Sequence, residues 1–182
     1  KLLGFSGEIY ITSGLDFSQI HRNERKNLWD CKPGTIEKGE DIFMGIDGTT
    51  INTKLKVYSS CKVNAEYESL EEVNEEKIVA VKLKANLEDG KDYVLTKVTN
   101  NVTLRDDGDL AVYDKEVEAV KSETETACTL YDKLEKENID WWKKVWDSSD
   151  ITIANDPENQ QGIRFCIFQM YQTYHGAVEG TN

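Results

Sequence analysis

The sequence has few of the features that mark membrane or nucleic-acid-binding proteins. Only two of its 182 residues are proline. Its longest apolar-rich window, 163–174, is interrupted by polar residues. A membrane-spanning helix needs about 20 consecutive apolar residues. Positive charge is also scarce, because 22 lysines and arginines face 34 aspartates and glutamates, for a formal net charge of −12. We therefore expect no nucleic-acid partner and no anionic membrane partner.

Cysteine is too sparse to indicate a zinc site. The four cysteines are Cys31, Cys61, Cys128 and Cys166, at least 30 residues apart. Structural zinc sites usually pair ligands a few residues apart. We interpret these residues as buried or free thiols in a reducing compartment, and expect a cytoplasmic protein without metal or cofactor. The chain begins at Lys1 rather than methionine, so a preceding secretory signal stays open.

Up to about residue 112 the hydrophobic pattern has period two, which is typical of half-buried antiparallel strands. Strands are predicted at 8–12, 51–59, 77–85 and 93–103, within an antiparallel sheet system over 5–112. The residues predicted to face the core are Ile9, Ile11, Leu55, Val57, Val79, Val81 and Leu83. The pair Asp89-Gly90 predicts a two-residue hairpin loop between the last two strands. Residues 16–47 show no clean period, and we expect a long loop there.

From Asp114 onward the spacing of apolar residues becomes helical. One stripe follows alternating steps of three and four residues through Val117, Val120, Thr124, Ala127, Tyr131 and Leu134. The pattern predicts helices near 115–136, 138–147 and 157–175. Asp156 is the expected N-cap of the third helix, with Pro157 in its first turn and Gly176 at its end.

The third predicted helix is apolar around much of its circumference. Its main stripe consists of Ile163, Ile167, Met170 and Tyr174. A helix of this kind is expected to be buried. The rest of the sequence offers no helices to surround it, so we expect its partners beyond Asn182.

Both ends of the chain carry motifs of one known family. The C-terminal motif comprises Trp142, Trp146, residues 150–153, Asp156, Pro157, Gln160 or Gln161, and residues 164–169. The N-terminal motif is residues 5–16. In this order and spacing they resemble glycoside hydrolase family 65, the family of maltose, trehalose and kojibiose phosphorylases. Residues 17–112 match it only in being rich in strands.

The resemblance implies an α+β fold, with part of an antiparallel β-sandwich, then linker helices, then the first helix of an (α/α)6 barrel. The corresponding domains are 1–112, 113–149 and 150–182. It also implies a parent enzyme that phosphorolyses an α-linked disaccharide with inversion, giving β-glucose 1-phosphate from inorganic phosphate as co-substrate. A homodimer or other self-association is expected. The family's catalytic glutamate and phosphate loop follow the equivalent of Asn182, so no catalytic residue is assigned and this chain is expected to be non-catalytic.

The chain contains two histidines and one small basic cluster that are candidate chemical groups. His21 and His175 are candidate bases, but isolated histidines are more often structural, and His175 follows a helix whose C-terminus favours a cation. Arg22, Arg25 and Lys26 form a small basic cluster, interrupted by Glu24, that we interpret as surface.

The aromatic and charged residues near the third helix have structural interpretations as well. Trp141, Trp142 and Trp146 are able to stack on sugar rings, although packing is the preferred interpretation. Arg164 is the charged residue embedded in the apolar helix, and we expect it to pair with a carboxylate.

Two other functions fit the sequence. One is a free-standing carbohydrate-binding β-sandwich with a helical tail. The apolar helix at 157–174 argues against it, because such a module does not require that helix. The other is a hydrolytic member of the same family, such as a trehalase, in which water replaces phosphate.

Overall fold

The computed structural model describes residues 4–104, 108–127 and 130–173. The chain divides into two compact units: residues 1–130, here the sheet unit, and residues 131–182, here the helical unit. None of the helices in the described ranges is long and apolar enough to cross a membrane.

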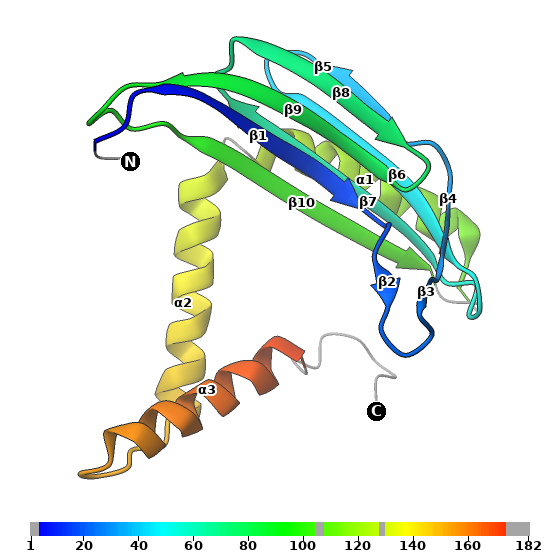
Figure 1. Cartoon of the computed structure of the whole chain (residues 1–182). Helices are drawn as coiled ribbons and strands as arrows, with labels where there is room; N and C mark the ends of the chain where they lie inside the picture. Colours follow the sequence, from blue (N-terminus) through cyan, green and yellow to red (C-terminus); the bar gives the residue numbers. More distant parts are fainter. Residues whose placement is uncertain (1–3, 105–107, 128–129, 174–182) are drawn as a thin grey trace. The chain divides into compact units, whose positions relative to one another are not determined.

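The sheet unit consists of antiparallel strands followed by one helix (Figure 1). Its strands are β1 (Gly7–Asp16), β2 (Ile20–His21), β3 (Lys26–Asn27), β4 (Trp29–Cys31), β5 (Thr35–Lys38), β6 (Ile42–Thr50), β7 (Lys56–Ala65), β8 (Ser69–Glu75), β9 (Ile78–Leu87) and β10 (Leu95–Leu104). One sheet has the order β1-β9-β8, and the other has the order β10-β7-β6-β4, with β5 also paired to β6. Strands β2 and β3 form a separate hairpin. Every strand pair is antiparallel, as the period-two pattern predicts.

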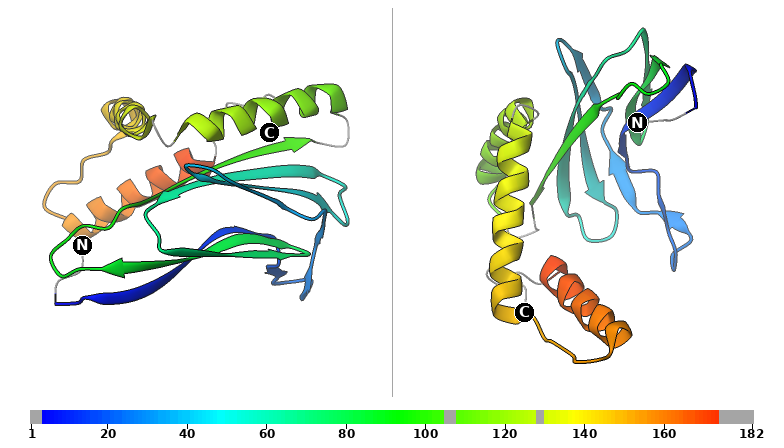
Figure 2. Two further views of the ribbon diagram at one scale, coloured as in Figure 1. Left: turned by 90° about the horizontal axis from the view of Figure 1, so that it is seen from above. Right: turned by 90° about the vertical axis from the view of Figure 1, so that its left-hand side faces the viewer.

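The main core lies between the two sheets, which face each other in layers (Figure 2). It is built from Leu15, Ile42, Met44, Ile46, Cys61, Val63, Val79, Val81 and Leu83. The predicted core positions Val79, Val81 and Leu83 are fully buried on β9, and Val57 is buried on β7. Ile9, Ile11 and Leu55 are only half-buried. Shared apolar burial of this kind is the main force holding a sandwich together.

Helix α1 (Leu110–Ala127) forms a third layer on the outer face of the second sheet (Figure 2). Because side chains alternate along β7, Tyr58 and Ser60 face α1 while Cys61 and Val63 face the main core. A second cluster joins sheet and helix through Tyr58, Val102, Tyr113 and Val120. The buried Thr124 hydroxyl lies 2.9 Å from the Ser60 hydroxyl and donates to the carbonyl of Val120. Asp109 caps the helix by accepting from the backbone N–H of Ala111.

The predicted loop over 16–47 and the predicted strand at 51–59 are both wrong. The predicted loop over 16–47 contains β2 to β5 and most of β6. β6 supplies Ile42, Met44 and Ile46 to the core, but its other face is also buried at Phe43 and Gly45, so apolar and polar residues do not alternate over 42–46. The predicted strand at 51–59 starts only at Lys56, because 51–55 form the loop between β6 and β7. That loop is closed by the Leu55 N–H, which donates to the Thr50 hydroxyl at 2.9 Å.

The predicted Asp89-Gly90 hairpin is also wrong, although a turn is present. Gly90 has a φ of 74°, and the Lys91 N–H donates to the Glu88 carbonyl at 3.1 Å. The flanking strands β9 and β10, however, lie in different sheets. The turn therefore carries the chain from one sheet of the sandwich to the other.

The helical unit consists of α2 (Tyr131–Ser149) and α3 (Pro157–Thr173). The predicted helix at 115–136 is wrong in its bounds, because α1 ends at Ala127 and α2 begins at Tyr131. The prediction at 138–147 covers only the later part of α2. α3 begins where predicted, and Asp156 caps it by accepting from the Asn159 N–H at 3.0 Å. Tyr174, His175 and Gly176 lie outside the described residues.

The predicted burial of α3 is not found within the described chain. Ile167 is its one buried residue there, while Phe165 and Met170 remain 60% and 57% exposed. The three-part division at 112 and 149 stays a prediction. In the structure α1 belongs with the sheets, since its apolar face packs on β7 and β10.

Candidate functional site

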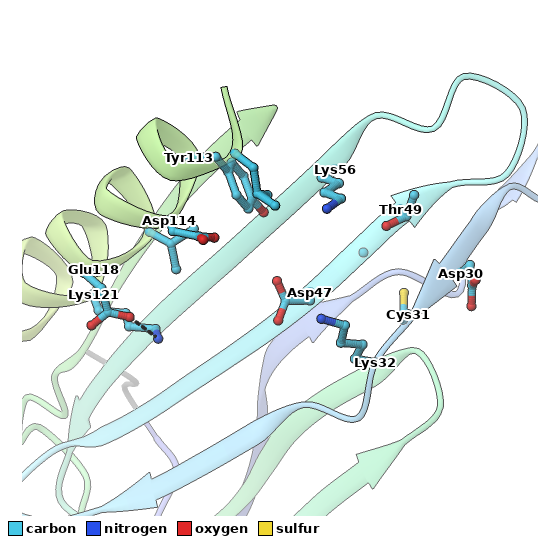
Figure 3. A pocket seen from close by; sticks show the side chains of 13 residues that line it. Asp30, Cys31, Lys32, Asp47, Thr49, Lys56, Tyr113, Asp114, Glu118 and Lys121 are labelled. Carbon is cyan, nitrogen blue, oxygen red and sulfur yellow. Dashed lines mark hydrogen bonds and ion pairs between the residues drawn. The ribbon is translucent and has the colours of Figure 1, made fainter. Parts of the chain in front are cut away.

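The outer face of β6 forms the floor of an open groove in the sheet unit. Alternation along β6 directs Met44 and Ile46 into the core and leaves Asp47 and Thr49 on the other face. α1 packs on β7 and β10 and stands beside this face as a wall (Figure 3). Between wall and floor lies a cavity of about 470 Å³.

Charged side chains of both signs line this cavity. The sheet side contributes Asp30, Lys32, Asp47 and Lys56, and α1 contributes Asp114, Glu118 and Lys121. The Lys121 Nζ lies 2.8 Å from a Glu118 oxygen and 5.3 Å from the ring centre of Tyr58. Burial, followed by the negative charge of Asp47, raises the pKa of Tyr113 to about 12, and the same two causes raise the pKa of Tyr58 above its usual value. Both phenols are therefore neutral hydrogen-bonding groups at pH 7.

A second cavity of about 180 Å³ shares Asp47 and Lys121 with the first. Tyr58 lines it and is only 4% exposed. The Tyr58 hydroxyl has no hydrogen-bond partner among the described residues. It lies above Gly45, where an added Cβ would stand 2.4 Å from the hydroxyl oxygen, so this approach requires glycine.

The groove contains one thiol, and it is poorly suited to nucleophilic catalysis. Cys31 is half-buried beside the cavity, and burial raises its pKa. A thiol with a raised pKa supplies little thiolate at neutral pH. The polar residues of the groove are therefore better suited to holding a ligand than to attacking one.

The basic candidates of the sequence lie elsewhere, on the β2–β3 hairpin. His21 is exposed, and its Nδ1 accepts from the Glu24 N–H at 3.3 Å. Arg22, Arg25 and Lys26 are exposed too, and Lys26 lies 3.7 Å from Glu24. The His21 carbonyl accepts from the Arg25 N–H, so both residues shape the tight turn.

The tryptophans of the helical unit pack against one another and against α3. Trp142 contacts Trp141, Trp146 and Phe168 at ring-centroid distances of 4.8, 5.9 and 4.9 Å. Trp141 also meets Tyr171 edge-on at 6.2 Å. This agrees with the packing interpretation of the three tryptophans, since such contacts stabilise paired helices.

Arg164 makes the carboxylate pair that its position in the apolar helix predicts. Its Nε and a terminal nitrogen donate to the two oxygens of Asp150 at 2.8 and 2.5 Å. The guanidinium holds the pKa of Asp150 below its usual value. The bidentate geometry ties the segment before α3 to its second turn.

The groove residues were missed by sequence reasoning because most of them lie in the region interpreted as loop. Asp30, Lys32 and Asp47 each stand on or next to a strand that the pattern did not reveal. The usable signal was the apolar spacing of Ile42, Met44 and Ile46, which places Asp47 on the opposite face. Their convergence on α1 depends on pairing between distant strands.

A sequence model for the N-terminal domain of glycosyl hydrolase family 65 matches residues 1–145. The chain belongs to glycosyl hydrolase family 65. The chain is 25% identical over 177 residues to trehalose 6-phosphate phosphorylase of Lactococcus lactis, and this match covers 95% of this chain and 22% of that protein. It is 26% identical over 186 residues to α,α-trehalose phosphorylase of Thermoanaerobacter brockii, covering 94% and 23%. A shorter match, 46% identical over 46 residues, joins it to maltose phosphorylase of Bacillus subtilis.

The fold of the family is found in a solved structure as well. A putative kojibiose phosphorylase from the human microbiome superimposes with a TM-score of 0.76 at 24% identity. The match covers 94% of this chain and 22% of that one. The chain thus spans less than a quarter of the length of these relatives, and its similarity to the solved structure concerns the fold.

Proposed function

We propose that this chain is the non-catalytic sandwich and linker portion of a protein that phosphorolyses an α-glucosidic disaccharide. The observation that carries the proposal is the family 65 match over residues 1–145, together with relatives that are named phosphorylases. In the proposed reaction a carboxylic acid protonates the glycosidic oxygen while inorganic phosphate attacks the anomeric carbon from the opposite face. The products are β-glucose 1-phosphate and the released sugar.

The described residues suit a supporting role better than this chemistry. Phosphate needs positive charge or backbone donors that converge on it. The basic cluster at 22–26 is exposed on a hairpin turn, and the lysines of the groove stand among carboxylates. We propose that the sheet unit supports a catalytic domain, and that α3 is the first helix of an (α/α)6 barrel.

The test is an assay for glucose 1-phosphate in the presence of inorganic phosphate and maltose, trehalose, kojibiose or nigerose. The 182-residue chain is expected to release none, while the protein encoded by the complete reading frame that contains it is expected to release it from at least one of them. Release by the 182-residue chain would overturn the non-catalytic role. Phosphate-independent release of glucose by the longer protein would instead indicate a hydrolase.

We also propose a cytoplasmic location and a homodimer for the parent protein. Cys31 and Cys166 are free thiols, as suits a reducing compartment. Cell fractionation tests the location, and sedimentation of the longer protein tests the dimer.

A further inference from the structure

The groove between β6 and α1 holds charged groups that lack partners in the fold. Asp30, Lys32, Asp47, Lys56 and Asp114 line it, and they form no ion pair or side-chain hydrogen bond with other described residues. Figure 3 shows Lys32 and Asp47 on the sheet side and Asp114 on α1, reaching toward the space between them. Asp47 is half-buried, while Asp30, Lys32, Lys56 and Asp114 are exposed, so these charges are accessible to a ligand from solvent.

The Tyr58 hydroxyl is a second, independent sign of a missing partner. It is a neutral phenol beside the smaller cavity, with no hydrogen-bond partner in the described part of the chain. Leaving a buried hydroxyl unsatisfied is costly, so such groups usually have a partner or a functional reason. Both cavities share Asp47, so one occupant is able to serve both sets of groups.

We propose that this groove is a non-catalytic binding site for a neutral saccharide of one or two sugar units. Each sugar hydroxyl both donates and accepts, so it matches a wall on which ammonium donors alternate with carboxylate acceptors. Leu110 and Val117 on α1 add apolar surface for the C–H face of a sugar ring. The volume of about 470 Å³ lies in the range of small-molecule sites.

The same groups argue against charged ligands. Four acids and three lysines line the larger cavity, so a phosphorylated sugar would meet carboxylates along with each lysine. A zwitterion carries one group of each sign and would pair only two of the five unpartnered residues. The described residues contain no cluster of three potential metal ligands. A neutral polyol is the class that satisfies most of the groove.

The site is tested on the 182-residue chain by titrating glucose and maltose and recording backbone amide spectra by NMR. Amide shifts are expected at Gly48, Thr49 and the first turns of α1. Asp47→Asn removes a charge from the floor with almost no change in shape, and Asp114→Asn does the same on the wall. Each is expected to weaken maltose binding about tenfold, as is usual when a charged hydrogen-bond acceptor is lost.

Asp92→Asn is the matched control, since Asp92 is exposed and does not line either cavity. It should leave binding unchanged. Unshifted groove amides at 100 mM maltose would overturn the proposal, and so would tighter binding of glucose 6-phosphate or glycine than of glucose. Equal maltose affinity in wild type and both groove variants would place the site elsewhere. If one variant misfolds, the other still decides, because the two lie on different elements. None of these readouts depends on phosphorolysis, so the proposed enzymatic function is tested separately.

Discussion

The sheet unit buries many of its apolar side chains, whereas the helical unit leaves many of its apolar side chains exposed. In the sheet unit two facing sheets enclose a main core whose central residues, such as Met44, Val81 and Leu83, are fully buried, and α1 covers a second cluster on the outer face of one sheet. In the helical unit Val145 and Ile167 are the buried residues of α2 and α3, and Phe165 and Met170 stay exposed. Strands that pair across long sequence distances complete a core within one segment of chain, whereas two helices alone leave most of their surface in water.

The largest expected effect comes from a cavity in the core of the sheet unit. Leu83→Ala should lower the free energy of unfolding by about 2–5 kcal/mol, because Leu83 is fully buried among well-packed neighbours. Urea denaturation measures the change. The matched control Leu134→Ala, at a 44% exposed position of α2, should change it by less than about 0.5 kcal/mol. Equal effects would contradict the contrast between the units.

The exposed face of α3 should make the chain self-associate. Burial of an aromatic or methionine side chain contributes roughly 1.5–3 kcal/mol, so Phe165 and Met170 supply a substantial driving force. Light scattering on the 182-residue chain should show species larger than a monomer. Phe165→Asp and Met170→Asp should each raise the dissociation constant at least tenfold. A monodisperse monomer in the unmodified chain would overturn this expectation.

Two Gly→Ala changes should have opposite signs in the two units. At Gly14 on β1 an added Cβ would lie 2.3 Å from the Val79 carbonyl oxygen and 2.4 Å from the Ala80 Cβ, so Gly14→Ala should destabilise the sheet unit by about 1–3 kcal/mol. At Gly162 in α3 the same atom meets nothing within 4 Å. Gly162→Ala should stabilise the helical unit by about 0.5–1 kcal/mol. Hydrogen exchange of amides in each unit separates the two effects.

Two Tyr→Phe changes compare a paired tyrosine hydroxyl in the helical unit with one in the sheet unit that is unpaired within the described chain. The Tyr171 hydroxyl lies 2.7 Å from that of Ser149, whereas the Tyr58 hydroxyl has no partner among the described residues. Tyr171→Phe should destabilise the helical unit by about 1 kcal/mol. Tyr58→Phe should stabilise the sheet unit by a similar amount, because a buried unsatisfied group is removed. Loss of stability in Tyr58→Phe would show that this hydroxyl has a partner.

The smallest effect is expected at the Asp150–Arg164 pair on the surface of the helical unit. The pKa of Asp150 is lowered in the fold, chiefly by its hydrogen bonds from Arg164, so the pair contributes stability above the ordinary aspartate pKa and loses it as pH falls through the folded pKa. In Arg164→Met the pKa of Asp150 should rise toward its usual value, as followed by NMR titration. Asp156 is the control, since its pKa is lowered by hydrogen bonds from Asn159 and should not change.

The sequence by itself determined the features that depend on neighbouring residues. Alternation identified β9 and its core positions, the Asp156 cap fixed the start of α3, and the isolated charge of Arg164 predicted its carboxylate partner. These patterns are readable because period and capping chemistry act over a few residues.

Only the tertiary structure decided how these pieces meet. It assigned β9 and β10 to different sheets, buried both faces of the first half of β6, and gathered Asp30, Asp47 and Asp114 around one groove. The physical reason is that strand pairing and helix docking join residues far apart in the chain. A strand buried on both faces loses the alternation that would reveal it, and no local pattern records which distant strand or helix will stand beside it.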